Sequence, residues 1–407
     1  MATNKVEIGF DLSGQPDAEF AKLDDAFYGI LDAAQTILGG AIYQDVTPDV
    51  LVYSISRGKS RQLDKYQSGK ANIQLDNNLR SYDPLYSASP YAGQILPKRE
   101  IRITSNSLVQ YQGVIDDWDL TYAPQGNSVA IIKASDGITQ IANQSLTATT
   151  TSTQFTGQRL AAILGNAGVQ WPNNLLDLET GAQSLQADVI SEGTNALSYI
   201  NSIADSEPGN FYISKSGIAT FDDRFKASAG TPLTFADDET GIPYQALAVV
   251  YGSELLYNEV TITRTNGGTA TAVNLDSQKD FGISSLSLSN LPLDNDTSAE
   301  NLATYLVSGY AQPEYRFESI EIDITDLSPT VQTQILSLEV TDFIRLVFTP
   351  NDVPPAIDRY AEVIRIAQTI TPTSHRVTLG LASTEYQFFT LSDAIFGRLT
   401  SGNGLSY

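Results

Sequence analysis

The sequence predicts a mainly β chain in which two β domains flank a small α+β domain. Apolar residues alternate with polar ones, as in half-buried strands, from about residue 45 and again from about residue 245. Between these regions, two stretches carry apolar residues at helical spacing. Hydrophobic residues make up 42% of the 407, enough for ordinary cores, and the 17% charged fraction argues against a disordered chain.

The first β domain is expected over residues 45–145. In LVYSISR the residues Leu51, Tyr53 and Ile55 share one face, and KANIQLDN alternates in the same way. IRIT, LVQYQGVIDDWDLTY and SVAIIKAS follow, separated by turn-rich segments. About five or six strands without a long helix are typical of a sandwich or barrel. Residues 1–44 are expected to be an irregular N-terminal extension that serves as a docking arm.

The small α+β domain is expected over residues 146–240. After a Thr-rich linker, QRLAAILGNAG predicts a helix with Thr156 as a cap and Gly168 as a stop. TNALSYINSIADSEPG predicts a second helix, which the Pro-Gly pair ends. NFYISKSGIATFDD predicts a hairpin that turns at Ser216-Gly217.

The second β domain is expected over residues 241–381. A capping box from Thr297 to Glu300 predicts one helix within it, and residues 382–407 are expected to be a C-terminal docking tail. The strand candidates are NEVTITR, SSLSLS, FESIEIDIT, ILSLEVTDFIRLVF, AEVIRIAQTI and HRVTLGLA.

The charge and cysteine content exclude several classes of function. A net charge of −23 repels DNA phosphates, so general DNA binding is not expected. The charge is interpreted either as a source of solubility or as a means of letting DNA pass nearby without binding. With no cysteine and one histidine, the chain has no disulfide and cannot build a Cys/His zinc site alone. The chain contains no run of about 18 apolar residues, so no membrane span is predicted. The first residues, MATNKVEIGFDLSG, lack the pattern of a signal peptide.

The segment from Leu51 to Arg102 departs from this acidic balance, with nine basic and four acidic residues. A basic segment in an acidic chain can bind nucleic acid, or it can complement an acidic face of a neighbouring subunit. We favour the neighbouring subunit.

No catalytic set or cofactor motif is expected. A Ser-His-Asp triad needs a histidine base, and His375, at the start of a probable strand, is interpreted as a solvated side chain. In DDWD, period-two alternation places Trp118 in the core and points Asp117 and Asp119 outward, which argues against a glycosidase pair.

Asp294 and Asp296 have the spacing of the start of a calcium loop, but the later Gly and Glu of such a loop are missing, so helix capping explains them better. No phosphate-binding glycine motif is present. The sequence therefore predicts no metal, no cofactor and no enzymatic activity.

The residues from 54 to 103, followed by GVIDDWDLTY, resemble a pattern common in minor tail proteins of long-tailed bacteriophages. The pattern has a strand, R-G-x-S-R-x-L-D, a G-x-A-x-x-x-L-D-N strand, a turn with Y/F-D-P, and P-x-R-x-I-R-I. Weaker similarity to tail hub or tail-tip proteins continues through 196–224, 257–264, the helix that precedes 315–325, and LSDAIFGRL. The matching residues are Arg57, Gly58, Ser60, Arg61, Leu63, Asp64, Gly69, Ala71, Leu75, Asp76, Asn77, Tyr82, Asp83, Pro84, Pro97, Arg99, Ile101, Arg102 and Ile103.

The resemblance implies a structural, non-enzymatic protein of the phage tail tip, located in the virion. It implies two β-barrel domains like the tail tube subunit, so that three chains form a ring of six barrels that adapts the sixfold tube to a threefold tip. The implied partners are two further copies, tube proteins above, and fibre or tip proteins around or below, while genomic DNA passes through without specific binding. The alternatives are a tail-associated carbohydrate-binding or polysaccharide-degrading β-protein, which would use Trp118 and Trp171, and a cell-surface adhesive protein.

Two groups of residues are candidates for contacts with partners. LDDAFYGIL and LSDAIFGRL are near-copies at the two ends of the chain, interpreted as two similar docking elements or as chance similarity. The docking repeat comprises Leu23, Asp25, Ala26, Gly29, Leu31, Leu391, Asp393, Ala394, Gly397 and Leu399. The candidate subunit interface comprises Arg57, Lys59, Arg61, Asp64, Arg80, Asp83, Arg99 and Arg102.

Overall fold

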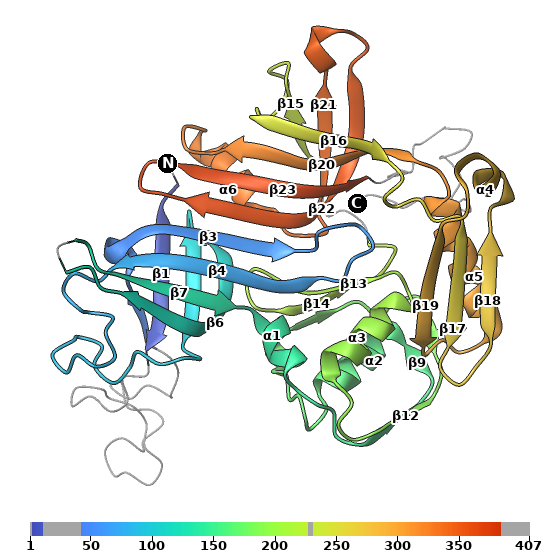
Figure 1. Cartoon of the computed structure of the whole chain (residues 1–407), viewed down its shortest axis with the longest axis horizontal. Coiled ribbons are helices and arrows are strands. Elements are labelled where there is room, and N and C mark those ends of the chain that lie inside the picture. Colours follow the sequence, from blue (N-terminus) through green and yellow to red (C-terminus); the bar gives the residue numbers. More distant parts are fainter. Residues whose placement is uncertain (1, 11–41, 125, 227–230, 384–407) are drawn as a thin grey trace.

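The computed structural model describes residues 2–10, 42–124, 126–226 and 231–383. Figure 1 shows a mainly β protein in which one large sheet runs through the molecule, with a helical insert beneath it and a smaller unit at one side. The predicted mainly β fold with an α+β insert is confirmed. Among the described residues, no helix has the length and apolar character needed to span a membrane.

The first β unit contains seven strands in the order β3-β4-β7-β6-β5-β1-β2, and every neighbouring pair is antiparallel. On β4, Ala71, Ile73 and Leu75 are buried, as their alternation predicts. Leu51 is instead 40% exposed, because it is the extra residue at a β-bulge between Val50 and Val52. The strands are β1 (Asn4–Phe10), β2 (Ile42–Asp45), β3 (Val50–Gly58), β4 (Gln67–Asp76), β5 (Glu100–Ser105), β6 (Leu108–Thr121) and β7 (Val129–Ser135).

The prediction that residues 1–44 are irregular is wrong for their first part. Asn4–Phe10 form β1, which pairs with β5 from Asn4↔Ser105 to Gly9↔Glu100. Val6, Ile8 and Phe10 alternate into the core of the first β unit, so burial on one face fixes this strand.

The second β unit is built around β20, β23 and β22, which are antiparallel neighbours. β16 extends the sheet beyond β20, while β21 pairs with β22 and carries the parallel strand β15. The elements are β15 (Leu233–Ala236), β16 (Ala246–Gly252), β20 (Glu314–Asp323), α6 (Pro329–Ser337), β21 (Phe343–Phe348), β22 (Ile357–Ile370) and β23 (His375–Ser383).

The two β units share one sheet, because β3 pairs with β22 from Gly58↔Arg365 to Tyr53↔Ile370. This ladder unites 13 strands and places β3 and β22 side by side in Figure 1. Gly58 is required there: its φ is +119°, and a Cβ would lie 2.2 Å from the carbonyl oxygen of Ile364. The Arg57-Gly58 pair of the sequence pattern therefore lies where β3 of the first unit pairs with β22 of the second.

The α+β insert contains three helices that pack with the second β unit in one core. The first predicted helix begins at Thr156 itself, and its cap is Phe155, whose N–H donates to Gln158 Oε1 at 3.1 Å. That helix ends at Leu164 instead of near Gly168. The elements are α1 (Gly137–Ala142), β8 (Thr149–Thr151), β9 (Gln154–Phe155), α2 (Thr156–Leu164), β10 (Leu176–Leu178), β11 (Ser184–Leu185), β12 (Asp188–Ile190), α3 (Ala196–Asp205), β13 (Asn210–Ile213) and β14 (Ala219–Asp222), the last two forming the predicted hairpin.

Residues 253–313 form a third unit that the sequence patterns did not separate from the second β domain. NEVTITR and SSLSLS do form strands, but in a separate sheet of order β18-β17-β19, covered by α5 over its own core. The predicted capping box from Thr297 to Glu300 is wrong, because the cap lies two residues earlier, at Asn295, whose Oδ1 accepts from Ser298 N at 2.9 Å. The elements are β17 (Glu259–Arg264), β18 (Thr269–Val273), α4 (Leu275–Phe281), β19 (Ser285–Leu291) and α5 (Asp296–Tyr310).

Candidate partner interface

The 23 residues that connect β4 to β5, 77–99, form an ordered loop. It begins at the buried Asn77, whose Oδ1 accepts from the backbone N–H of Tyr82 at 3.0 Å. The Tyr82 hydroxyl donates to Asp49 at 2.7 Å, and successive tight turns run from Arg80 to Gln94. The loop therefore has a defined conformation although it contains no strand or helix.

A stack of aromatic rings holds this loop against the first β unit. The ring centroids of Phe10 and Tyr91 lie 4.5 Å apart, those of Tyr91 and Tyr82 5.5 Å, and those of Tyr82 and Trp118 6.2 Å. Trp118 also donates its indole N–H to the Leu96 carbonyl at 3.1 Å. Stacked rings at these separations stabilise the loop beyond the apolar area that they bury.

The same loop carries large apolar side chains on its outside. Leu79 is 83% exposed, Leu85 89% and Leu96 47%. Between the first two, Arg80 forms an ion pair with Asp83 at 2.7 Å, and the Leu85 N–H and Arg80 together lower the pKa of Asp83. Ordered loops with exposed apolar side chains are typical of protein–protein contacts. We call Leu79, Leu85 and Leu96 the loop leucines.

Two of the predicted interface residues are buried and join units of this chain. Arg57 has a side chain that is 5% exposed and forms an ion pair with Glu339 at 2.8 Å. Lys59 is 6% exposed, and its Nζ donates to Asn210 Oδ1 at 2.8 Å. Both therefore link the first β unit to other parts of the same molecule.

Asp83 is also buried, at 3% exposed, whereas the other predicted interface residues lie nearer the surface; all of them also contact the chain itself. Arg61 pairs with Asp64 at 3.2 Å and with Glu254 at 3.1 Å, and Arg102 pairs with Glu7 at 2.9 Å. Arg80 pairs with Asp83, and Arg99 donates to the side-chain and backbone oxygens of Gln94. A role for these residues in contacting a neighbouring subunit stays a prediction. The docking repeat, residues 23–31 and 391–399, lies outside the described residues.

His375 is fully buried, so the interpretation as a solvated side chain is wrong. Its Nε2 lies 3.0 Å from Gln368 Oε1, Gln368 donates to Gln110 at 2.8 Å, and Gln110 donates to the Leu336 carbonyl at 3.1 Å. This chain of hydrogen bonds runs from β23 through β22 to β6 and α6, and so crosses between the two β units. Burial lowers the pKa of His375 to about 4.

The carboxylates weighed as catalytic or metal-binding groups are exposed or have structural partners. Asp117 and Asp119 are exposed, while Trp118 packs against the core, as alternation predicts. Asp296 pairs with Arg264 at 2.6 Å, and Asp294 accepts from Ser298 Oγ at 2.7 Å. Within the described residues, no group of three or more His, Asp or Glu side chains is placed to hold a metal ion.

The fold is similar to that of two solved tail proteins. The tail protein from Neisseria meningitidis MC58 aligns with a TM-score of 0.58 and 9% identity, over 93% of this chain and 96% of that chain. The 43 kDa tail protein of prophage MuSo2 from Shewanella oneidensis aligns with a TM-score of 0.55 and 12% identity, over 84% of this chain and 94% of that chain. No family model and no curated protein match the sequence. The chain therefore has the fold of these tail proteins over nearly its whole length, as the sequence pattern led us to expect.

Proposed function

We propose that this protein is a structural hub protein at the distal end of a phage tail. The observation that supports this most is the similarity to a tail protein over 93% of this chain and 96% of that one. Three copies would assemble into a ring, and each would contribute its two β units, so that six units meet the sixfold tube above. Fibre or tip proteins would bind around or below this ring.

The arrangement of the two β units supports a ring of this kind. Because β3 and β22 belong to one sheet, the two units of a chain keep a fixed relative position. A rigid pair of units is what a threefold assembly needs in order to present six equivalent positions.

We propose that the chain is divided into the segments 1–44, 45–145, 146–240, 241–381 and 382–407, with residues 253–313 as a separate unit inside the fourth segment.

The charge of the protein suits a channel for DNA. A net charge of −23 repels phosphates at short range, so genomic DNA would pass the ring without binding to it. The proposed role is structural and includes no catalytic step.

Native mass spectrometry and negative-stain microscopy of the purified full chain test the ring. We expect a species of three times 44.0 kDa and ring-shaped particles. A chain that stays monomeric at micromolar concentration, both alone and mixed with tail tube protein, would contradict the proposal. In a gel-shift assay at about 0.1 M salt we expect no complex with double-stranded DNA.

The carbohydrate-binding alternative gains no support from the two tryptophans. The Trp118 indole donates to Leu96 and its ring stacks on Tyr82, whereas the Trp171 indole donates to the Leu175 carbonyl at 2.9 Å. A Cβ on Gly137 would lie 2.2 Å from the Trp171 ring, so this ring packs directly on the start of α1. Both rings are engaged inside the fold.

A further inference from the structure

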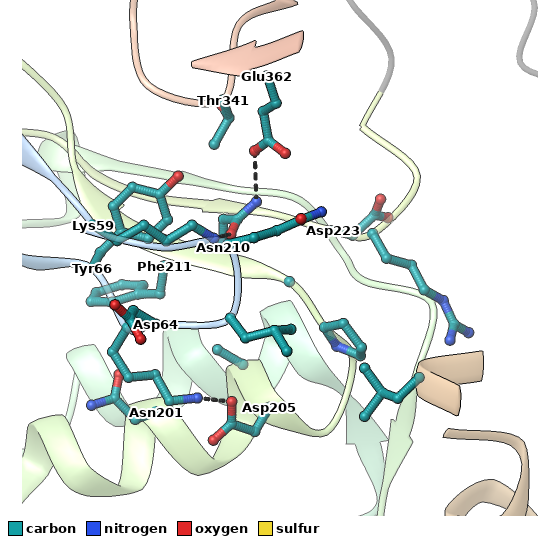
Figure 2. A pocket seen from close by; sticks show the side chains of 18 of the residues that line it. Lys59, Asp64, Tyr66, Asn201, Asp205, Asn210, Phe211, Asp223, Thr341 and Glu362 are labelled. Carbon is teal, nitrogen blue, oxygen red and sulfur yellow. Dashed lines mark hydrogen bonds and ion pairs between the residues drawn. The ribbon is translucent and has the colours of Figure 1, made fainter. Parts of the chain in front are cut away.

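A cavity of about 320 Å³ lies where all four parts of the chain meet. Its walls come from the β3–β4 connection of the first β unit, α3 and β13 of the insert, β19 and α5 of the third unit, and β21 and β22 of the second β unit. Figure 2 shows side chains from these elements converging on the space. Neither the fold similarity nor the proposed tail role assigns a function to this cavity.

One end of the cavity holds a buried lysine, Lys59. Lys59 donates to Asn210 Oδ1, and Asn210 Nδ2 lies 3.5 Å from Glu362 Oε1, so the amide stands between the two side chains, as Figure 2 shows. Within the described residues, Lys59 forms no ion pair. An ammonium group has three N–H donors, and Asn210 takes one of them.

Burial shifts the pKa values of the two ionisable groups at this end. Burial lowers the pKa of Lys59, because the charged ammonium loses solvation there. Burial likewise raises the pKa of Glu362, which reduces its negative charge. A bound anion would stabilise the charged form of Lys59.

Tyr66 supplies a second donor at the same end. It is 8% exposed, it lines the cavity, and its hydroxyl is buried with no hydrogen-bond partner among the described residues. Lys59 Nζ lies 4.8 Å from the centre of its ring. Buried hydroxyls nearly always have a partner, so the unpartnered Tyr66 O–H is an unused donor close to Lys59.

Part of the cavity wall is apolar. It is formed by Leu63 of the β3–β4 connection and by Leu286, Leu288, Leu306 and Tyr310 of the third unit. Other charged groups that line the cavity have partners of their own: Lys65 pairs with Asp205, Asp64 with Arg61, and Lys226 with Asp222. The cavity thus combines one end that carries the Lys59 amine with an apolar part of its wall.

We propose that this cavity binds a carboxylate carried on a short apolar stem. The carboxylate oxygens accept hydrogen bonds from Lys59 and Tyr66, and the stem packs against the leucines of the third unit. Such a ligand contacts three parts of the chain together and ties the third unit to the first β unit. The same chemistry is offered by a free carboxylic acid and by the end of a peptide chain.

Isothermal titration of the full chain with acetate, butyrate and hexanoate tests the site. We expect saturable binding of hexanoate, with affinity rising about fourfold for each added methylene. Lys59→Met should weaken hexanoate binding at least tenfold and Tyr66→Phe several-fold, because each removes a donor to the carboxylate. N-acetyl-leucine is the probe for a peptide end: if it binds more tightly than hexanoate, the natural ligand is a chain end, and if more weakly, a free acid.

Two controls make the test specific. Lys98→Met removes an exposed lysine that pairs with Asp116 at 2.9 Å and should leave hexanoate affinity unchanged. Inorganic phosphate, which has no apolar stem, should bind more weakly than hexanoate. The proposal is overturned if hexanoate gives no saturable heat, if phosphate binds equally well, or if Tyr66→Phe binds hexanoate like the wild type. The Tyr66 variant decides the matter even if the Lys59 variant does not fold.

Discussion

Arg57 of the first β unit and Glu339, beside the second, form an ion pair at 2.8 Å with the arginine almost fully buried. Burial alone would raise the pKa of Glu339, but Arg57 and the N–H and ammonium groups of Lys215 outweigh it and lower the pKa. Removing one member of a buried pair leaves the other charge poorly solvated. We expect Arg57→Met to lower the free energy of unfolding by about 3 kcal/mol in urea denaturation.

The matched control for this change is Arg345→Met. Arg345 pairs with Asp358 at 2.5 Å across the β21–β22 ladder, with side chains 41% and 46% exposed. An exposed pair contributes less than about 1 kcal/mol. Equal losses in the two variants would show that the Arg57–Glu339 pair does not hold the units together.

The buried His375 predicts a loss of stability in mild acid. Its pKa in the folded protein is about 4, below the ordinary histidine pKa of 6.5, so the unfolded chain binds a proton between these pH values and the folded chain does not. The stability that the neutral ring provides is full above about pH 6.5 and falls as the pH drops toward 4, by about 3 kcal/mol in all.

Comparison of the wild type with His375→Gln isolates this effect. The pKa of Asp136, raised to about 6 by burial, acts in the opposite direction, but it is present in both proteins. We expect the unfolding free energy of the wild type to decline more steeply from pH 7 to pH 4 than that of the variant. Parallel curves would mean that His375 does not titrate differently in the folded state.

The sequence predicted the strand content well, because alternation reports burial on one face of a strand. Ala71, Ile73 and Leu75 face the core as expected. Sequence patterns did not predict the β3–β22 ladder, because pairing between residues more than 300 positions apart leaves no local pattern. They also failed to separate residues 253–313, because strands of a small sheet covered by one helix alternate in the same way as strands of a larger one.

The candidate interface was predicted less completely than the fold. The nine basic residues suggested a partner, but sequence alone did not show that Arg57 would reach Glu339 or Arg102 would reach Glu7. His375 was misread because a strand-end position says nothing of the strands that cover it. In the sequence, the loop leucines are recognisable only as apolar residues in a turn-rich segment. Their exposure becomes evident only in the structure.

Gly58 is expected to be the least replaceable residue of the junction. Gly58→Ala places a methyl group against the Ile364 carbonyl at a φ of +119°, so we expect more than about 3 kcal/mol of destabilisation or failure to fold, measured by denaturation and soluble yield. Gly93→Ala is the control, because Gly93 has a φ of +75° but no atom within 4 Å of its Cβ position. It should lose only about 1 kcal/mol. A tolerant Gly58→Ala would contradict the close β3–β22 contact.

The loop leucines give the most direct test of how the chain meets its neighbours. Leu85 is 89% exposed on a loop that aromatic stacking holds in place, so Leu85→Asp should change the free energy of unfolding by less than about 0.5 kcal/mol. If the loop lies in the contact between copies, the buried charge should abolish the proposed trimer in sedimentation velocity. Leu275→Asp, at a 74% exposed position on α4, is the control and should still form trimers. Trimers that persist with Leu85→Asp would place the contact between copies elsewhere, because a carboxylate cannot remain unpaired in a closed apolar interface.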